Sequence, residues 1–188
     1  MAAVRRVLIA ALPVLICCSG AEVPNLDSPG TSIVCFGDSI TAGVGRGRAP
    51  SYPEVLAEEL GGQVVNAGAP GETSVQGLAR IDEALAQDPW LVIVELGGND
   101  LLRQIPLEST EDALSEIIEL ILDAGAVPML LEIHGPFGGR YEDLFARLGK
   151  RYRVPVVTDL LPTILSDRRL KSDPIHPNGA GYRRLGEG

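Results

Sequence analysis

Five short runs of apolar, largely β-branched residues alternate along the chain with longer segments of helical periodicity. The runs are SIVCFG (32–37), QVVNAG (63–68), LVIVELG (91–97), VPMLLEI (127–133) and VPVVTDL (154–160). Because they are apolar almost throughout, they are typical of strands covered on both faces. This alternation limits the fold more than any other feature, since strands joined by helical crossovers run parallel.

The segments between the runs place apolar residues three and four positions apart, as amphipathic helices do. Thr73-Ser74 and Ser109 to Asp112 supply capping residues at two helix starts, and Gly125 supplies a stop. The resulting βαβαβαβαβ order predicts an α/β fold, a three-layer α/β/α sandwich. The expected helices cover residues 52–60, 73–87, 109–123 and 141–152.

The N-terminus differs in character from the rest of the chain. Arg5 and Arg6 precede an apolar run from Val7 to Ile16, and small residues follow, which is the layout of a secretory signal. That run is too short to span a bilayer. The rest of the 188-residue chain has the usual length of one domain. The expected division is a signal peptide at 1–20, a linker at 21–30 and one folded domain at 31–188, in an exported protein that is periplasmic or extracellular.

Processing of this signal has more than one interpretation. Cys18-Ser19-Gly20 suits cleavage by an ordinary signal peptidase before Ala21, whereas Leu15 to Cys18 resembles a lipoprotein signal. In the second interpretation Cys18 carries a lipid that anchors the mature protein. An uncleaved N-terminal anchor is a third interpretation. Of these interpretations we favour a soluble product. Apart from the lipid anchor at Cys18 in the lipoprotein form, we expect no stable membrane insertion.

The charge balance excludes one class of partner. Without residues 1–20 the chain carries 14 basic and 25 acidic side chains, a net charge of −11. Such a surface repels phosphate backbones, so nucleic acid is not an expected partner. Only Cys35 remains inside the expected domain, where it is interpreted as core packing, so no disulfide framework can form.

Small and polar residues follow the first four runs, at the points where the expected strands end. They are GDSIT (37–41), NAGAPG (66–71), GGND (97–100) and HGPFGG (134–139). In a parallel α/β sheet the ligand site lies beyond the carboxyl ends of the strands. A functional site is therefore expected at this edge of the sheet.

A serine at a strand end is commonly a turn or helix-capping residue, so Ser39 is a nucleophile only with a base beside it. The chain has two histidines. His176 has a carboxylate nearby in sequence, Asp173, which can accept the Nδ1 proton and leave Nε2 facing Ser39. His134 has only Glu132 near it in sequence, and we expect it to line the cleft or cap a turn.

An oxyanion that develops on a carbonyl oxygen also needs hydrogen-bond donors. The same edge offers the backbone N–H of Ser39, a backbone N–H from the loop at 68–71 and the side-chain amide of Asn99. Gly97 and Gly98 allow a sharp turn that points Asn99 into the cleft. Together with the serine, histidine and aspartate, these donors favour acyl transfer.

Four blocks, VCFGDSITAG, NAGAPGETS, VELGGNDLL and SDPIHPN, resemble in order and spacing the four sequence blocks of the SGNH (GDSL-type) esterases and lipases. The resemblance covers Ile33 to Asn178, and PGETSVQGLARI with VELGGNDLLR makes it most similar to the bacterial arylesterase, thioesterase I and lysophospholipase type. It implies a flavodoxin-like sandwich whose five parallel strands have the order 2-1-3-4-5. No metal and no organic cofactor are implied.

The resemblance also implies roles for individual residues, carried over position by position. The nucleophile falls on Ser39, the base on His176 and the third triad member on Asp173. The oxyanion donors fall on the Ser39 N–H, on the Asn99 side chain and on Gly71, with Gly68 as the alternative to Gly71. Two further acids are implied to cap and brace the loops without taking part in the chemistry, Asp38 and Asp100.

We expect a serine esterase that hydrolyses carboxylic esters or thioesters of small to medium acyl groups through an acyl-enzyme. Its partner is then a small-molecule ester or thioester. A carbohydrate or peptidoglycan O-acetylesterase is the alternative among enzymes, and an inactive binding module on the same fold is the alternative from another class. Residues expected to line the substrate cleft are Leu101, Leu102, Ile105, His134, Pro136 and Phe137.

The C-terminal segment departs from the pattern of the family. Twelve residues follow His176, and four glycines among them make a poor helix. Family members usually close with a longer terminal helix. We therefore expect a shortened C-terminus and weaker support for the histidine loop. The glycines are Gly179, Gly181, Gly186 and Gly188.

Overall fold

The computed structural model describes residues 22–133 and 139–188. Its centre is one five-stranded sheet in which all pairs are parallel and the strand order is β2-β1-β3-β4-β5. The predicted order 2-1-3-4-5 is therefore confirmed. The strands are β1 (Ser32–Gly37), β2 (Gln63–Gly68), β3 (Pro89–Glu95), β4 (Val127–Leu131) and β5 (Val156–Val157).

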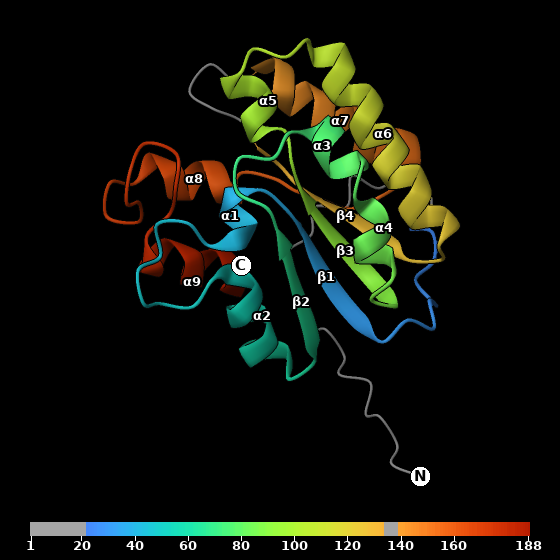
Figure 1. Ribbon diagram of the computed structural model, residues 1–188, viewed down its shortest axis with the longest axis horizontal. Coiled ribbons are helices and arrows are strands. Elements are labelled where there is room, and N and C mark those ends of the chain that lie inside the picture. Colours follow the sequence, from blue (N-terminus) through green and yellow to red (C-terminus); the bar gives the residue numbers. More distant parts are fainter. Residues whose placement is uncertain (1–21, 134–138) are drawn as a thin grey trace.

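Helices cover both faces of the sheet, which confirms the predicted α/β/α sandwich (Figure 1). They are α1 (Ser39–Ala42), α2 (Tyr52–Leu60), α3 (Ser74–Leu78), α4 (Ile81–Leu85), α5 (Gly98–Leu102), α6 (Leu107–Asp123), α7 (Gly139–Tyr152), α8 (Leu160–Ser166) and α9 (Gly179–Glu187). In one layer α9 packs against α2 and α8, and in the other α6 packs against α3, α4 and α7.

The core is formed around the central strands. All six residues of β1 are buried, because helices lie on both of its faces. From the helical layer, α6 contributes Ile117, Ile118 and Ile121, which are fully buried. The edge strand β2 differs, since its residues are half-buried or exposed. The prediction that QVVNAG is covered on both faces is therefore wrong, because β2 lies at the margin of the sheet, where the helices bury it less completely than the central strands.

One predicted helix is divided in two. The segment expected to be helical over 73–87 forms α3 and α4, with the break at Arg80. There the guanidinium turns toward the sheet and donates to the carbonyl oxygens of Gly37 and Ala67. The predicted cap at the start is confirmed, because the side chain of Thr73 accepts the N–H of Gln76.

Several predicted boundaries shift because the backbone turns at particular residues. The expected strand 91–97 ends at Glu95, since Gly97 has a φ of 116° and caps α5. The expected strand 154–160 is reduced to β5, since Asp159 has a φ of 60° and begins α8. The expected strand 127–133 ends at residue 131. The start of α6 lies two residues before the predicted caps, following Pro106, whereas Gly125 ends it as predicted.

The C-terminal segment forms the helix α9, so the expectation of a poorly helical tail is wrong. Asn178 caps this helix by accepting two backbone N–H groups at 3.0 and 3.1 Å. The glycines allow close packing, because a Cβ on Gly181 would collide with the carbonyl oxygen of Leu170 and a Cβ on Gly186 would collide with Val55. Tertiary contact thus stabilises a helix that intrinsic propensity disfavours.

Removing this cap is expected to destabilise the protein. Asn178→Ala should lower the free energy of unfolding by about 1–2 kcal/mol, because α9 loses its N-cap acceptor. The Asn178 amide also donates to the carbonyl oxygens of Arg169 and Lys171, at 2.8 and 3.3 Å. Asn178→Asp is the control for the cap, since it keeps the accepting oxygen at the start of α9, although it replaces the donor by a charged oxygen. Urea denaturation compares the three proteins, and equal stability of all three would contradict the assigned cap.

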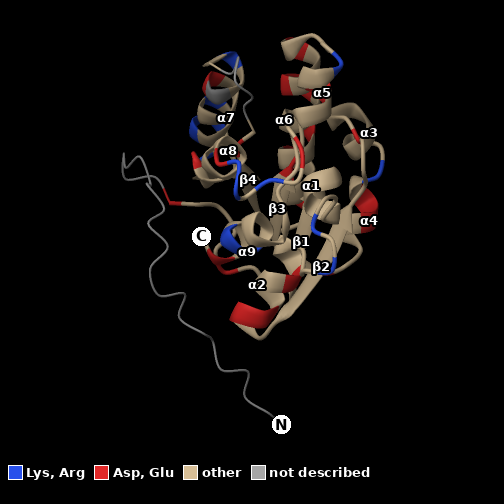
Figure 2. Cartoon of the chain, turned by 90° about the vertical axis from the view of Figure 1, so that its left-hand side faces the viewer, with Lys and Arg blue, Asp and Glu red and all other residues tan. Residues whose placement is uncertain are grey.

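The surface of the folded part is mixed in charge. Figure 2 shows lysine, arginine and acidic residues interspersed over the helices and loops. The chain as a whole has a formal net charge of −9. Within residues 22–133 and 139–188, no helix has the length and apolar content needed to cross a bilayer.

Candidate active site

The carboxyl ends of the neighbouring strands β1 and β3 bring the GDS and GGND segments to one edge of the sheet (Figure 1). After β1 the chain turns directly into α1, and Asp38 caps that helix by accepting the N–H of Ile40 at 3.0 Å. Ser39 is the first residue of α1 and is partly exposed. The predicted nucleophile is thus held by a capped turn between a strand and a helix.

His176 lies 137 residues further along the chain and reaches Ser39 across this edge. Its Nε2 is 2.9 Å from Oγ of Ser39, and its Nδ1 is 2.8 Å from Oδ2 of Asp173. When Nδ1 donates to the carboxylate, Nε2 has a lone pair that can accept the hydroxyl proton. The three side chains form a continuous path of hydrogen bonds from carboxylate to hydroxyl.

The loop around His176 fixes the carboxylate of Asp173. Its Oδ1 accepts the backbone N–H groups of Ile175 and His176, each at 2.9 Å. Desolvation raises the pKa of Asp173, but these hydrogen bonds and the imidazole outweigh it and hold the pKa below its ordinary value. A hydrogen bond from the Ser172 N–H to the His176 carbonyl oxygen, at 3.0 Å, closes the loop.

The two glycines considered as oxyanion donors differ in their hydrogen bonds. The Gly68 N–H donates to Oδ1 of Asn66 at 3.0 Å. Gly71 has a φ of 81°, and the hydrogen bonds of the described residues include none donated by its N–H. Of the two, Gly71 therefore has the N–H that is available to a ligand.

Asn99 lies at the start of α5, and its amide is held from two sides. Its Nδ2 donates to Oδ2 of Asp38 at 2.7 Å and to the carbonyl oxygen of Glu72 at 3.0 Å. These contacts link the turn after β1, the loop after β2 and the helix after β3. Both N–H groups of the Asn99 amide have protein acceptors in this structure.

Asp100, the neighbour of Asn99, is fully buried. Its carboxylate accepts the backbone N–H of Ser74 at 2.9 Å, the Ser74 hydroxyl, and the Thr110 hydroxyl at 3.2 Å. Asp100 therefore joins α5 to the starts of α3 and α6 and braces the helix that carries the amide.

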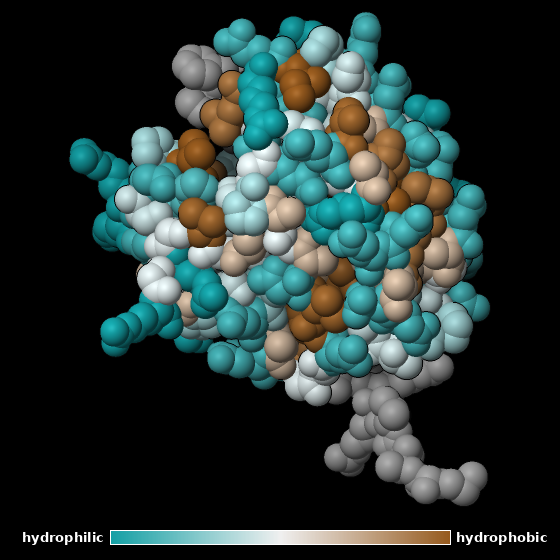
Figure 3. All heavy atoms as spheres, viewed as in Figure 1, coloured by the Kyte–Doolittle hydropathy of each residue, from teal (hydrophilic) through white to brown (hydrophobic). Residues whose placement is uncertain are grey.

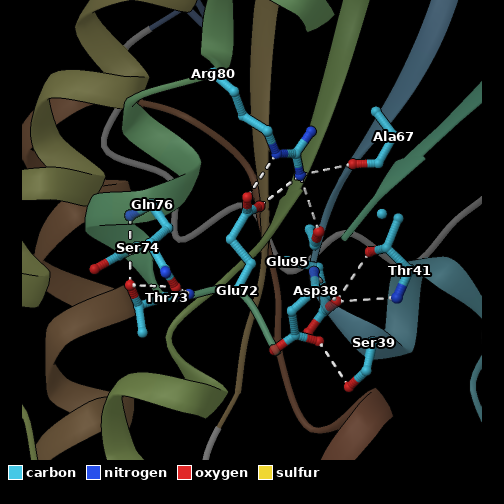
Figure 4. A network of polar contacts seen from close by, with 12 residues as sticks. Asp38, Ser39, Thr41, Ala67, Glu72, Thr73, Ser74, Gln76, Arg80 and Glu95 are labelled. Atoms are coloured by element: carbon cyan, nitrogen blue, oxygen red, sulfur yellow. Dashed lines mark hydrogen bonds and ion pairs between the residues drawn. The ribbon is translucent and has the colours of Figure 1, made fainter. Parts of the chain in front are cut away.

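Two charged residues of this region, one half-buried and one fully buried, were not among the sequence candidates (Figure 4). Arg80 donates to both carboxylate oxygens of Glu72 and to backbone carbonyls at the ends of β1 and β2. Glu95 is fully buried at the end of β3. The sequence nevertheless contained a signal for each residue. Glu95 is a charged residue inside an apolar strand run, and Arg80 is a charged residue inside an expected amphipathic helix.

The predicted substrate-lining residues differ in exposure. On α5, Leu102 is 56% exposed, whereas Leu101 is half-buried against the core. Ile105, in the loop that follows, is half-buried. The remaining three lie outside the described residues, and they are His134, Pro136 and Phe137.

Two exposed apolar residues beside the hydrogen-bonded set were not singled out from the sequence. Val44, whose N–H donates to the carbonyl oxygen of Ser39, is 37% exposed, and Ile175, next to His176, is 42% exposed. Figure 3 shows a hollow between α5 and α8 with hydrophobic residues beside it. Apolar surface therefore accompanies the polar groups at this edge.

Comparison with known sequences agrees with this geometry. Residues 35–184 match the GDSL-like Lipase/Acylhydrolase family. The chain belongs to this family. The predicted resemblance and the enzyme class, a GDSL-type hydrolase, are thereby confirmed. In this hydrolase the family's namesake block reads GDSI, at the turn that carries Ser39.

Individual relatives of this GDSL-type hydrolase are named as enzymes that act on esters or thioesters. It is 36% identical over 157 residues to thioesterase 1/protease 1/lysophospholipase L1 of Escherichia coli strain K12, with 78% of this chain and 76% of that protein covered. It is 34% identical over 158 residues to an arylesterase of Vibrio mimicus, with 77% and 79% covered. The solved structure of the psychrotrophic esterase EstA from Pseudoalteromonas sp. has a TM-score of 0.72 and 26% identity, with 84% of this chain and 93% of that chain covered.

Proposed function

We propose that this GDSL-type hydrolase is a serine esterase in which Ser39, His176 and Asp173 act as a catalytic triad. The observation that carries the proposal is the unbroken path of hydrogen bonds through the imidazole, at 2.8 and 2.9 Å. A serine hydroxyl needs a base in that position to lose its proton as it attacks a carbonyl. The matching family and the names of the relatives support the same reaction class.

The proposed acylation step moves one proton and exchanges one bond. Nε2 of His176 takes the proton of Ser39 as Oγ attacks the acyl carbon, and the carboxylate of Asp173 stabilises the imidazolium that forms. The imidazolium then gives this proton to the leaving alcohol or thiol as its bond to carbon breaks. Water attacks the resulting acyl-enzyme by the same route, with His176 again as base, and releases the acid.

The proposed oxyanion donors are the backbone N–H groups of Ser39 and Gly71 and the side-chain amide of Asn99. The unpaired state of the Gly71 N–H among the described residues supports it over Gly68. Asn99 must share one of its two N–H groups with the oxyanion. We expect it to give up the longer contact, the one to the Glu72 carbonyl oxygen at 3.0 Å, and to keep the one to Asp38.

We propose esters or thioesters with small to medium acyl groups as the substrates. The exposed apolar side chains of Val44, Leu102 and Ile175 offer surface on which acyl methylene groups can be buried. These three side chains have no polar groups with which to recognise a sugar ring. They therefore favour acyl-chain recognition over an O-acetylesterase acting on carbohydrate or peptidoglycan.

We propose that the enzyme is exported, with residues 1–20 as signal peptide, 21–30 as linker and 31–188 as the enzyme domain. Arg5 and Arg6 ahead of the apolar run support this division. Mass spectrometry of the protein recovered from cells decides it. An N-terminal Ala21 supports an ordinary signal peptide, and a lipid on Cys18 supports the lipoprotein form. An uncleaved N-terminus contradicts both forms of processing.

A fluorophosphonate probe tests whether Ser39 is activated, because it labels only a serine with a base beside it. We expect one adduct per chain, located on Ser39 by peptide mass spectrometry, and no labelling of Ser39→Ala. Ser166→Ala is the matched control, since that hydroxyl contacts only a carbonyl oxygen on the exposed end of α8, and it should label like the parent. An unlabelled parent protein would favour the inactive binding module.

A further inference from the structure

Glu95 is a fully buried carboxyl group that the proposed triad does not use. It is the last residue of β3, and its side chain lies beside the turn that carries Ser39 (Figure 4). Its Oε2 accepts three hydrogen bonds, from the Asp38 N–H at 3.3 Å, the Thr41 N–H at 3.1 Å and the Thr41 hydroxyl at 2.9 Å. Glu95 therefore ties the start of α1 to the sheet.

The second carboxyl oxygen of Glu95 has a different environment. Oε1 is buried, and no donor among the described residues reaches it. An ionised carboxylate spreads its charge over both oxygens, so Oε1 would then hold negative charge without any hydrogen bond. Burying a charge in this way is strongly unfavourable, whereas a neutral carboxyl group avoids most of the cost.

Among the described residues, the ionisable groups whose charges act on Glu95 are an acid, a thiol and phenols, and they supply no compensating positive charge. They are Asp38 from the turn, Tyr52 from α2 with Cys35 of β1 beside it, and Tyr182 from α9. The ion pairs of the described residues include none with Glu95. Burial and then the charge of Asp38 raise the pKa of Glu95 well above its ordinary value, against the hydrogen bonds to Oε2.

Asp38 and Glu95 are neighbours in the fold, since the Asp38 N–H donates to Oε2 of Glu95 at 3.3 Å. Two ionised carboxylates in such a buried site repel each other, which favours a proton on one of them. Asp38 is the better place for the negative charge, because its two oxygens accept the Ile40 N–H and the Asn99 amide respectively. Oε1 of Glu95 is the oxygen left for the proton.

We propose that Glu95 is a positioning residue that remains protonated in the folded enzyme, with the proton on Oε1 while Oε2 holds the start of α1. The pair then carries one negative charge beside the proposed oxyanion site in place of two. A second negative charge there would oppose the charge that develops in the transition state. The effect on turnover rests on the proposed function, but the proton can be measured without any substrate.

Glu95→Gln tests the proton directly, because glutamine has the shape and charge of the neutral acid. In the folded parent Glu95 keeps its proton, whereas the unfolded chain releases it above the ordinary pKa of glutamate. The stability of the parent therefore falls as the pH rises from that ordinary pKa toward the raised pKa of the folded state. The ratio of unfolding equilibrium constants, parent over Glu95→Gln, should therefore rise about tenfold per pH unit from roughly pH 5 to neutrality. A ratio independent of pH would overturn the proposal. Glu58→Gln, on the exposed side of α2, is the matched control for losing one glutamate.

Infrared spectroscopy of the parent decides the question if Glu95→Gln fails to fold. A carbonyl stretch of a protonated carboxyl group at neutral pH, shifted when glutamate is labelled with ¹³C, supports the proposal, and the absence of any such band contradicts it. Where the variants fold, Glu95→Gln should keep kcat within about threefold of the parent, whereas Glu95→Leu should lose roughly tenfold or more. Equal losses of kcat in the two folded variants would contradict the proposal that position 95 acts as a neutral hydrogen-bonding group.

Discussion

Ser39→Ala and His176→Ala are each expected to lower kcat by roughly four to six orders of magnitude, because triad members act as a unit. The first change removes the proposed nucleophile, and the second removes the proposed base, whose Nε2 lies 2.9 Å from the hydroxyl oxygen. Neither side chain is part of the core, so both variants should fold and unfold like the parent. Hydrolysis of p-nitrophenyl acetate measures the loss, and circular dichroism confirms the fold.

The double variant sharpens this prediction. Ser39→Ala with His176→Ala should be about as slow as either single variant, since removing one member already disables the others. Ser166→Ala should retain the activity of the parent, because among the described residues its hydroxyl forms a hydrogen bond only with the Thr163 carbonyl oxygen. A single variant that hydrolyses the ester at the rate of the parent would remove that residue from the triad.

Asn99→Ala is expected to lower kcat by about 10²- to 10³-fold, the usual effect of deleting one oxyanion donor. The Michaelis constant should change little, because the charge that this amide stabilises exists only in the transition state. The amide is already oriented by its contacts to Asp38 and to the Glu72 carbonyl oxygen. Steady-state kinetics over a range of ester concentrations separates the two parameters.

Asn66→Ala is the matched control for this change. Asn66 lies near the end of β2, at the same edge of the sheet, and within the described part of the chain its side-chain oxygen accepts only the N–H of Gly68. Its loss should leave kcat close to that of the parent. If Asn99→Ala instead raised the Michaelis constant at unchanged kcat, Asn99 would be a residue that binds the ground state, and the assigned donor role would be wrong.

Much of this site could be predicted because its parts follow strands. Ser39 and Asn99 come after β1 and β3, which are neighbours in the sheet, so the topology alone brings them to one edge. His176 needed a chemical argument, since no periodicity relates it to Ser39. What marked it was the carboxylate three positions upstream, Asp173, which now lies 2.8 Å from its ring.

The roles of other residues could not be predicted, because they depend on groups that meet only after folding. In the sequence Arg80 is indistinguishable from other charged residues on helices. Its role depends on the carbonyl oxygens at the ends of two strands, which lie opposite it only in the folded protein. Likewise, Gly181 and Gly186 read as helix breakers, although the lack of a side chain is what lets α9 approach its neighbours. Local propensity is a weak guide where tertiary contact decides.

The hydrogen bond between Ser39 and His176 can form only late in the synthesis of the chain. A ribosome adds Ser39, the proposed nucleophile, 137 residues before His176, the proposed base. A partly synthesised chain therefore holds Ser39 without this imidazole, however early its first strands form. In the proposed mechanism, hydrolysis begins only once the late segment has been synthesised and has docked.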